Sequence, residues 1–190
     1  MAVQTGKIIL IHGPSSSGKS AIAGELQARI EAPFWHISID HMRDAGILPM
    51  ARIRSREFPW TGLRGPFFDG FHHALAAFAG SGNNLIVEHI VETQEWMGDL
   101  VRLLTGFDVF FVRIHCDVEE MERREIARGD RRAGDARRDF ETLPVFSHDL
   151  ELDSTATKAG ENVDRLLSAW RARRRPSAFE RMAQDTSVGG

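Results

Sequence analysis

The chain has 190 residues, of which 42% are hydrophobic and 27% are charged, and its formal net charge is −3. These proportions are typical of one globular domain and exclude wholesale disorder, collagen-like repeats and a small disulfide scaffold. The acidic balance argues against a general nucleic-acid-binding protein, and no apolar run approaches the roughly 20 residues of a membrane span. We therefore expect neither a nucleic-acid nor a membrane partner. The single cysteine, Cys116, and an N-terminus without signal-peptide character favour a location in the reducing cytoplasm.

Strands and helices are predicted to alternate along the chain. Apolar runs and apolar spacing predict, in chain order, strand 7–11, helix 19–30, strand 34–39, an irregular segment rich in Pro and Gly at 43–66, helix 67–79, strand 84–91, helix 94–104, strand 109–115, helix 118–127, strand 150–153 and helix 159–173. This alternation predicts an α/β fold of three layers, with a five-stranded parallel sheet and helices on both faces. We assign residues 1–175 to this domain and expect the polar residues 176–190 to be a flexible tail.

A phosphate-binding loop follows the first predicted strand. The sequence Gly-Pro-Ser-Ser-Ser-Gly-Lys-Ser, starting at Gly13, fits the pattern G-x4-G-K-S/T between a strand and a helix. Backbone amides of such a loop bind the phosphates of ATP, the lysine reaches the β- and γ-phosphates, and the last serine binds Mg²⁺. The predicted nucleotide-binding residues are Gly13, Pro14, Ser15, Ser16, Ser17, Gly18, Lys19, Ser20 and Ala21.

Acidic residues end the next two strands, at the edge of the sheet where ligands bind in this fold class. Asp40 follows strand 34–39, where it could orient the hydroxyl of an acceptor or cap the next helix, and the residues alone leave both functions open. Glu88, in strand 84–91, is predicted to hold Mg²⁺ directly or through water, with Glu92 a weaker candidate and a solvated acid the alternative. Of the neighbouring histidines, His41 is interpreted as a polar neighbour rather than a base, and His89 as structural, with contact to the substrate as its alternative.

Seven arginines stand between residues 123 and 138 against three acids. Arg124 and Arg128 are four residues apart and therefore share a helix face. Arginine stabilises the charge that develops on a transferred phosphoryl group, and a segment that closes over the site excludes water. We therefore predict an arginine-rich lid at about 128–138, with Arg128 and Arg131 on phosphate. The arginines assigned to surface ion pairs are Arg123, Arg137 and Arg138.

Together these motifs resemble the chloramphenicol phosphotransferase family, P-loop kinases with an adenylate/shikimate-kinase-like fold. The resemblance rests on the P-loop, Ile39-Asp40, Leu48-Pro49-Met50, Cys116-Asp117, the arginine segment 124–134 and Leu152-Asp153-x-Thr155. It implies that Asp40 is the base for the acceptor hydroxyl, that Arg124 lies by the adenine and Arg128 reaches phosphate, and that Arg131 belongs to the lid. The chain departs from the family at Glu88-His89, in place of two aspartates, and in 52–66.

The resemblance and the motifs predict an ATP- and Mg²⁺-dependent O-phosphotransferase, similar to chloramphenicol 3-O-phosphotransferase, that acts on a hydroxyl of a small molecule. Lys19, Asp40, Arg128 and Arg131 are its predicted catalytic residues, and Ser20 and Glu88 hold the metal. The acceptor is expected to bind at about 43–66, against Arg54, Arg56 and Trp60. Two alternatives stay open, namely a nucleotide or metabolite kinase of the same fold, and an ATP-binding regulatory module without small-molecule kinase activity.

Overall fold

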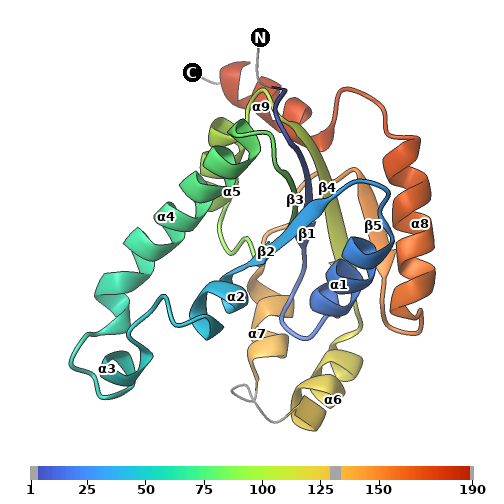
Figure 1. Ribbon diagram of the computed structural model, residues 1–190. Helices are drawn as coiled ribbons and strands as arrows, with labels where there is room; N and C mark the ends of the chain where they lie inside the picture. The colour runs from blue at the N-terminus through green and yellow to red at the C-terminus, as the bar shows by residue number, and fades with distance from the viewer. Residues whose placement is uncertain (1–3, 129–133, 189–190) are drawn as a thin grey trace.

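Apolar strands form the centre of the molecule. The computed structural model describes residues 4–128 and 134–188 and contains one sheet of parallel strands in the order β2-β3-β1-β4-β5 (Figure 1). Ile8 to Ile11 in β1 are fully buried on both faces of the sheet, which is why this strand has no polar alternation. The strands are β1 (Lys7–His12), β2 (Phe34–Ser38), β3 (Asn84–His89), β4 (Asp108–His115) and β5 (Leu150–Asp153).

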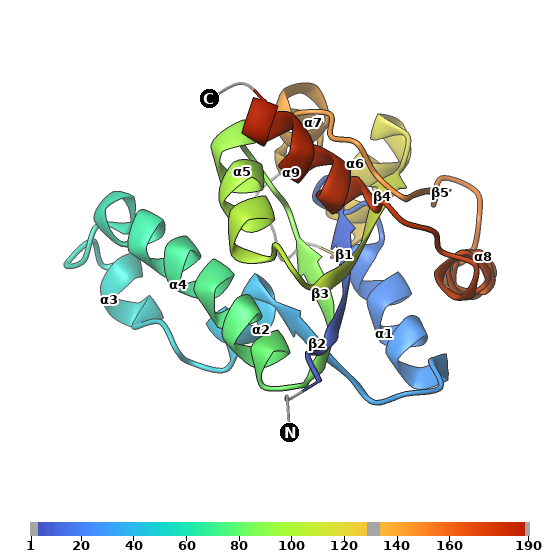
Figure 2. The same cartoon turned by 90° about the horizontal axis from the view of Figure 1, so that it is seen from above.

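Helices cover both faces of the sheet. On one face α1 (Lys19–Arg29) and α8 (Ala159–Arg171) enclose a core with Ile9, Ile11 and Trp170. On the other face α4 (Trp60–Gly80), α5 (Gln94–Leu103) and α9 (Ala178–Val188) pack against Ile8 and Leu10. Figure 2 shows the two groups of helices on opposite sides of the strands.

The remaining helices surround the carboxyl ends of the strands, at the bottom of Figure 1. They are α2 (Ile39–Asp44), α6 (Val118–Arg128) and α7 (Asp135–Thr142). The short helix α3 (Met50–Arg54) and the first turns of α4 project away from the sheet as an arm (Figure 1). Within the described ranges 4–128 and 134–188, no helix combines the length and the apolar character needed to cross a membrane.

The predicted strands and most helices are confirmed within a few residues, but three expectations need correction. The irregular segment 43–66 contains the end of α2, all of α3 and the start of α4. Part of the expected lid is helical, because α7 begins at Asp135. The segment 176–190, expected as a flexible tail, contributes α9, whose Ala178 and Phe179 are buried in the core. The Ala178 amide donates to Asp149 Oδ1 at 2.7 Å, which fixes the first turn of this helix.

Candidate active site

The phosphate-binding loop has the predicted backbone form. It leaves β1 at Gly13, where a Cβ would lie 2.7 Å from the carbonyl oxygen of Ile114, and it ends at Gly18, whose φ of 87° favours glycine. The Lys19 ammonium donates to the Pro14 carbonyl at 2.6 Å. Two hydroxyl oxygens, Ser16 Oγ and Ser17 Oγ, are buried without a hydrogen-bond partner among the described residues. Unsatisfied buried hydroxyls and a glycine-shaped cradle fit a polyphosphate ligand.

Ser154 supports the loop from β5. Its hydroxyl donates to the Ser17 carbonyl at 2.7 Å, and its backbone amide donates to the His115 carbonyl at 2.9 Å. Ser154 is itself 5% exposed, so these bonds are shielded from water. The loop is thereby tied to the ends of β4 and β5.

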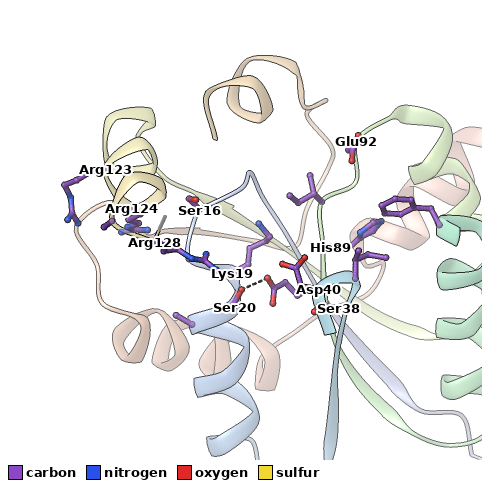
Figure 3. Close-up of a pocket in the computed structure, with 17 residues that line it drawn as sticks. Ser16, Lys19, Ser20, Ser38, Asp40, His89, Glu92, Arg123, Arg124 and Arg128 are labelled. Carbon is purple, nitrogen blue, oxygen red and sulfur yellow. Dashed lines mark hydrogen bonds between the residues drawn. The ribbon is translucent and has the colours of Figure 1, made fainter. Parts of the chain in front are cut away.

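A hydrogen-bonded triad occupies the predicted metal position. Ser20 Oγ donates to Glu88 Oε1 at 2.6 Å, the dashed line in Figure 3, and His36 Nε2 lies 3.3 Å from Glu88 Oε2. Burial raises the pKa of the Glu88 carboxyl, but the bonds from His36 and Ser20 and the charge of Lys19 outweigh it and hold that pKa below its ordinary value. The carboxylate is thus kept ionised beside a hydroxyl, and this oxygen pair suits Mg²⁺. His36 was not predicted, because only the register of β2 against β3 brings it to Glu88.

Asp40 lies on the cavity wall rather than at the helix cap. The cap of α2 is Ser38, whose side chain accepts from the His41 amide at 3.1 Å. Asp40 is in the first turn of α2, one third exposed, and its Oδ1 lies 3.0 Å from Arg43 Nη1. Figure 3 shows its carboxylate pointing into the cavity on the side of Lys19 and Ser20. The capping function that the sequence left open therefore belongs to Ser38.

Helix α6 brings two of the predicted arginines to the loop. Arg124 Nε donates to Glu120 at 2.7 Å and its Nη2 donates to the Ser154 carbonyl at 2.5 Å, so the guanidinium lies over Gly18. Arg128, at the end of α6, also lines the cavity (Figure 3). Arg131 lies outside the described residues. The expected surface ion pairs are confirmed as Arg123–Glu120, Arg137–Glu122 and Arg138–Asp135, although Arg123 also borders the cavity.

These groups enclose a cavity of about 520 Å³. Opposite the phosphate loop its wall consists of residues at or just after the ends of β2 and β3 and of one ring from α4. The residues of this wall are Ile39, Asp40, Phe68, His89, Ile90 and Glu92. The arginines and the tryptophan expected in an acceptor pocket, Arg54, Arg56 and Trp60, do not line the cavity, because α3 and the start of α4 hold them on the projecting arm.

A buried histidine pair supports the cavity wall opposite the phosphate loop. His89 Nε2 lies 3.0 Å from His72 Nε2, and the His89 ring stacks against Phe68 and Trp96. Burial and the neighbouring His72 lower the pKa of His89 well below its ordinary value, and burial also lowers that of His72. Both imidazoles are therefore neutral near pH 7. His89 has the structural function that the sequence suggested and also contributes to the cavity surface. Glu92 pairs with Arg64 at 2.6 Å.

Known proteins are similar to this chain in sequence. The family described as chloramphenicol phosphotransferase-like protein matches residues 6–171. A Mycobacterium tuberculosis (strain H37Rv) protein with the provisional name O-phosphotransferase Rv2636 is 34% identical over 197 residues, covering 93% of this chain and 88% of that protein.

Solved kinase structures have the same architecture. The Mycobacterium tuberculosis APS kinase CysC, in complex with AMPPNP and APS, has a TM-score of 0.67 and 17% identity, over 88% of this chain and 98% of that chain. The Acinetobacter baumannii shikimate kinase, in complex with shikimate, has a TM-score of 0.61 and 15% identity, over 92% and 98%. These likenesses concern the fold, and they confirm the predicted α/β architecture with a five-stranded parallel sheet.

Proposed function

This chain belongs to the chloramphenicol phosphotransferase-like family, and from that premise we propose that it uses ATP and Mg²⁺ to phosphorylate a hydroxyl group of a small molecule. Membership of this family already identifies the chain as an enzyme that transfers phosphate. One observation carries the finer proposal: the Lys19 loop, the Ser20–Glu88 pair and Asp40 border a single cavity at the carboxyl ends of the strands.

The phosphate side of the cavity binds the nucleotide. Lys19 and the loop amides hold the phosphates, and the hydroxyls of Ser16 and Ser17 are available as further donors. Arg124 lies beside Gly18, where it would contact the nucleotide, and Arg128 neutralises charge on the transferring group. Ser20 and Glu88 would hold Mg²⁺, which supplies additional neutralisation of phosphate charge.

Asp40 acts on the acceptor. In an alcohol kinase a carboxylate accepts the hydroxyl proton as the oxygen attacks phosphorus, and Asp40 is a partly exposed carboxylate on the cavity wall opposite the phosphate loop. Phe68 and Ile90 give the same wall an apolar surface, against which the carbon skeleton of an acceptor can pack. The acceptor oxygen would then lie between Asp40 and the phosphates.

The test is mass spectrometry of hydroxylated compounds after incubation with the protein, ATP and Mg²⁺, beginning with chloramphenicol. We expect a product heavier by one phosphoryl group, made by the intact protein and not by Lys19→Ala. Asp40→Asn should bind ATP with unchanged affinity and lose at least about 100-fold in turnover, because the proton acceptor is gone. Equal turnover in Asp40→Asn would remove this residue from the mechanism.

The two other functions predict different results in the same experiment. A nucleotide or metabolite kinase would phosphorylate a nucleoside monophosphate or a sugar acid and leave chloramphenicol unchanged. A regulatory module would bind ATP and yield no phosphorylated small molecule at all. The apolar surface of Phe68 and Ile90, beside the carboxylates of Asp40 and Glu92, favours an uncharged acceptor over an anionic nucleotide.

A further inference from the structure

A carboxylate from α7 is bonded to the phosphate-binding loop. The backbone amide of Ser15 donates to Asp139 Oδ2 at 3.0 Å, across 124 residues of sequence. Asp139 is 5% exposed, so water does not compete effectively for this bond. An anionic side chain thus accepts a hydrogen bond from one amide of a loop whose other amides can bind an anionic ligand.

The same peptide group also holds the catalytic lysine. Pro14 and Ser15 share one planar peptide, whose carbonyl accepts from Lys19 Nζ at 2.6 Å and whose amide donates to Asp139. Because the peptide is planar, a rotation that broke one bond would misalign the other. The negative charge on Asp139 also polarises the peptide and strengthens its carbonyl as an acceptor. The position of the Lys19 ammonium is therefore linked to that of Asp139.

Asp139 is itself rigidly held. Its Oδ1 accepts from Arg138 Nη2 at 2.8 Å. The first turn of α7 is fixed by Glu125 of α6, a buried carboxylate that accepts from the Gly134 amide at 2.8 Å and from the Ala136 amide at 3.0 Å. Helix α7 is thus joined to α6 at one end and to the phosphate loop at Asp139.

We propose that Asp139 is a positioning residue, which fixes the Pro14–Ser15 peptide and through it sets Lys19 for phosphate transfer. This inference rests on the proposed kinase function. The other loop amides bind nucleotide without Asp139, so its loss should lower kcat rather than raise KM for ATP. A misplacement of about 1 Å in such a site costs on the order of 100-fold in rate. We expect Asp139→Ala to lose 10- to 100-fold in kcat, with KM for ATP changed less than about threefold.

Two further variants separate positioning from general stability. Asp139→Asn keeps an oxygen acceptor for the Ser15 amide and should recover much of the lost kcat. Asp135→Asn is the matched control, because Asp135 pairs with the same Arg138 at 2.8 Å but, among the described residues, makes no hydrogen bond to the loop. We expect its kcat and its Tm to remain close to those of the unaltered protein.

A measurement independent of turnover reports on Lys19 directly. The chain has three lysines, Lys7, Lys19 and Lys158, and the first and last are exposed. In protein labelled with ¹³C at lysine Cε, Lys19→Arg identifies the Lys19 signal. We expect that signal to move in nucleotide-free Asp139→Ala and to stay in place in Asp135→Asn.

The outcomes are distinct. A moved signal together with a reduced kcat supports the proposal. A moved signal in a protein that phosphorylates no acceptor keeps the contact and rejects the proposed function. An unmoved Lys19 signal in Asp139→Ala overturns the proposal whatever the activity. A raised KM and lowered kcat that Asp135→Asn reproduces would also overturn it.

Discussion

His12 should make the protein less stable in mild acid. It ends β1 directly before the phosphate loop, is 4% exposed, and its Nδ1 accepts from the Val91 amide at 3.1 Å. Burial, followed by the charge of Lys19, lowers its pKa from 6.5 to about 3, against the opposing effect of a bond to the His89 backbone. Arg113 and His148 lower the pKa of His12 further. The imidazole is therefore neutral in the folded protein above about pH 3.

The sign of the pH dependence follows from the two pKa values. Between pH 6.5 and about 3 the unfolded chain binds a proton at His12 that the folded protein does not. Its contribution to stability is complete above pH 6.5 and is lost progressively as the pH falls. Each pH unit corresponds to about 1.36 kcal/mol, so at pH 5 the loss is about 2 kcal/mol from this residue.

Urea unfolding at pH 7 and at pH 5 measures the effect, with the unaltered protein compared with His12→Gln. Glutamine keeps an oxygen acceptor for the Val91 amide but does not titrate. We expect the variant to be less stable at pH 7 and to lose about 2 kcal/mol less than the unaltered protein on going to pH 5. His73→Gln is the control, since His73 is exposed. Equal losses in the unaltered protein and His12→Gln would refute the reasoning.

Two carboxylates give further predictions. Glu88→Gln should raise the Mg²⁺ concentration for half-maximal turnover by about 10- to 100-fold, because the Ser20–Glu88 pair loses its charge, and an unaltered Mg²⁺ titration would argue against this site. Glu125→Ala should lower the free energy of unfolding by about 2–4 kcal/mol, because it leaves the Gly134 and Ala136 amides without their acceptor. Thermal and urea unfolding check this, with the exposed Glu119→Ala as control; similar losses in both variants would contradict it.

Local sequence patterns predicted the phosphate loop, the strand ends and α6, because these depend on contiguous residues. His36–Glu88 and Ser15–Asp139 were not predicted, since they join residues 52 and 124 positions apart. Asp139 stands in a charged helix whose sequence resembles a solvated surface, and its 5% exposure and its bond from Ser15 distinguish it from Asp135 only in the structure.

Among the helices that were missed or shortened, α4 and α9 illustrate two different reasons. The first turns of α4 contain Gly62, Gly65 and Pro66. These residues weaken a helix, so the sequence predicted irregular structure there. In α9 Ala178 and Phe179 are buried in the core and Met182 and Ala183 pack against it, but the segment is otherwise polar and was therefore expected to be a tail. Tertiary contacts with Asp149 and the core decide its structure.

The contacts of Ser154 have a consequence for how tightly a nucleotide can be held. Because Ser154 ties the Ser17 carbonyl to the end of β5, the backbone of the phosphate loop is ordered when the domain folds. The conformational entropy of that loop is lost at folding, and nucleotide binding does not have to remove it again. The loop of three successive serines is therefore already ordered before the nucleotide binds.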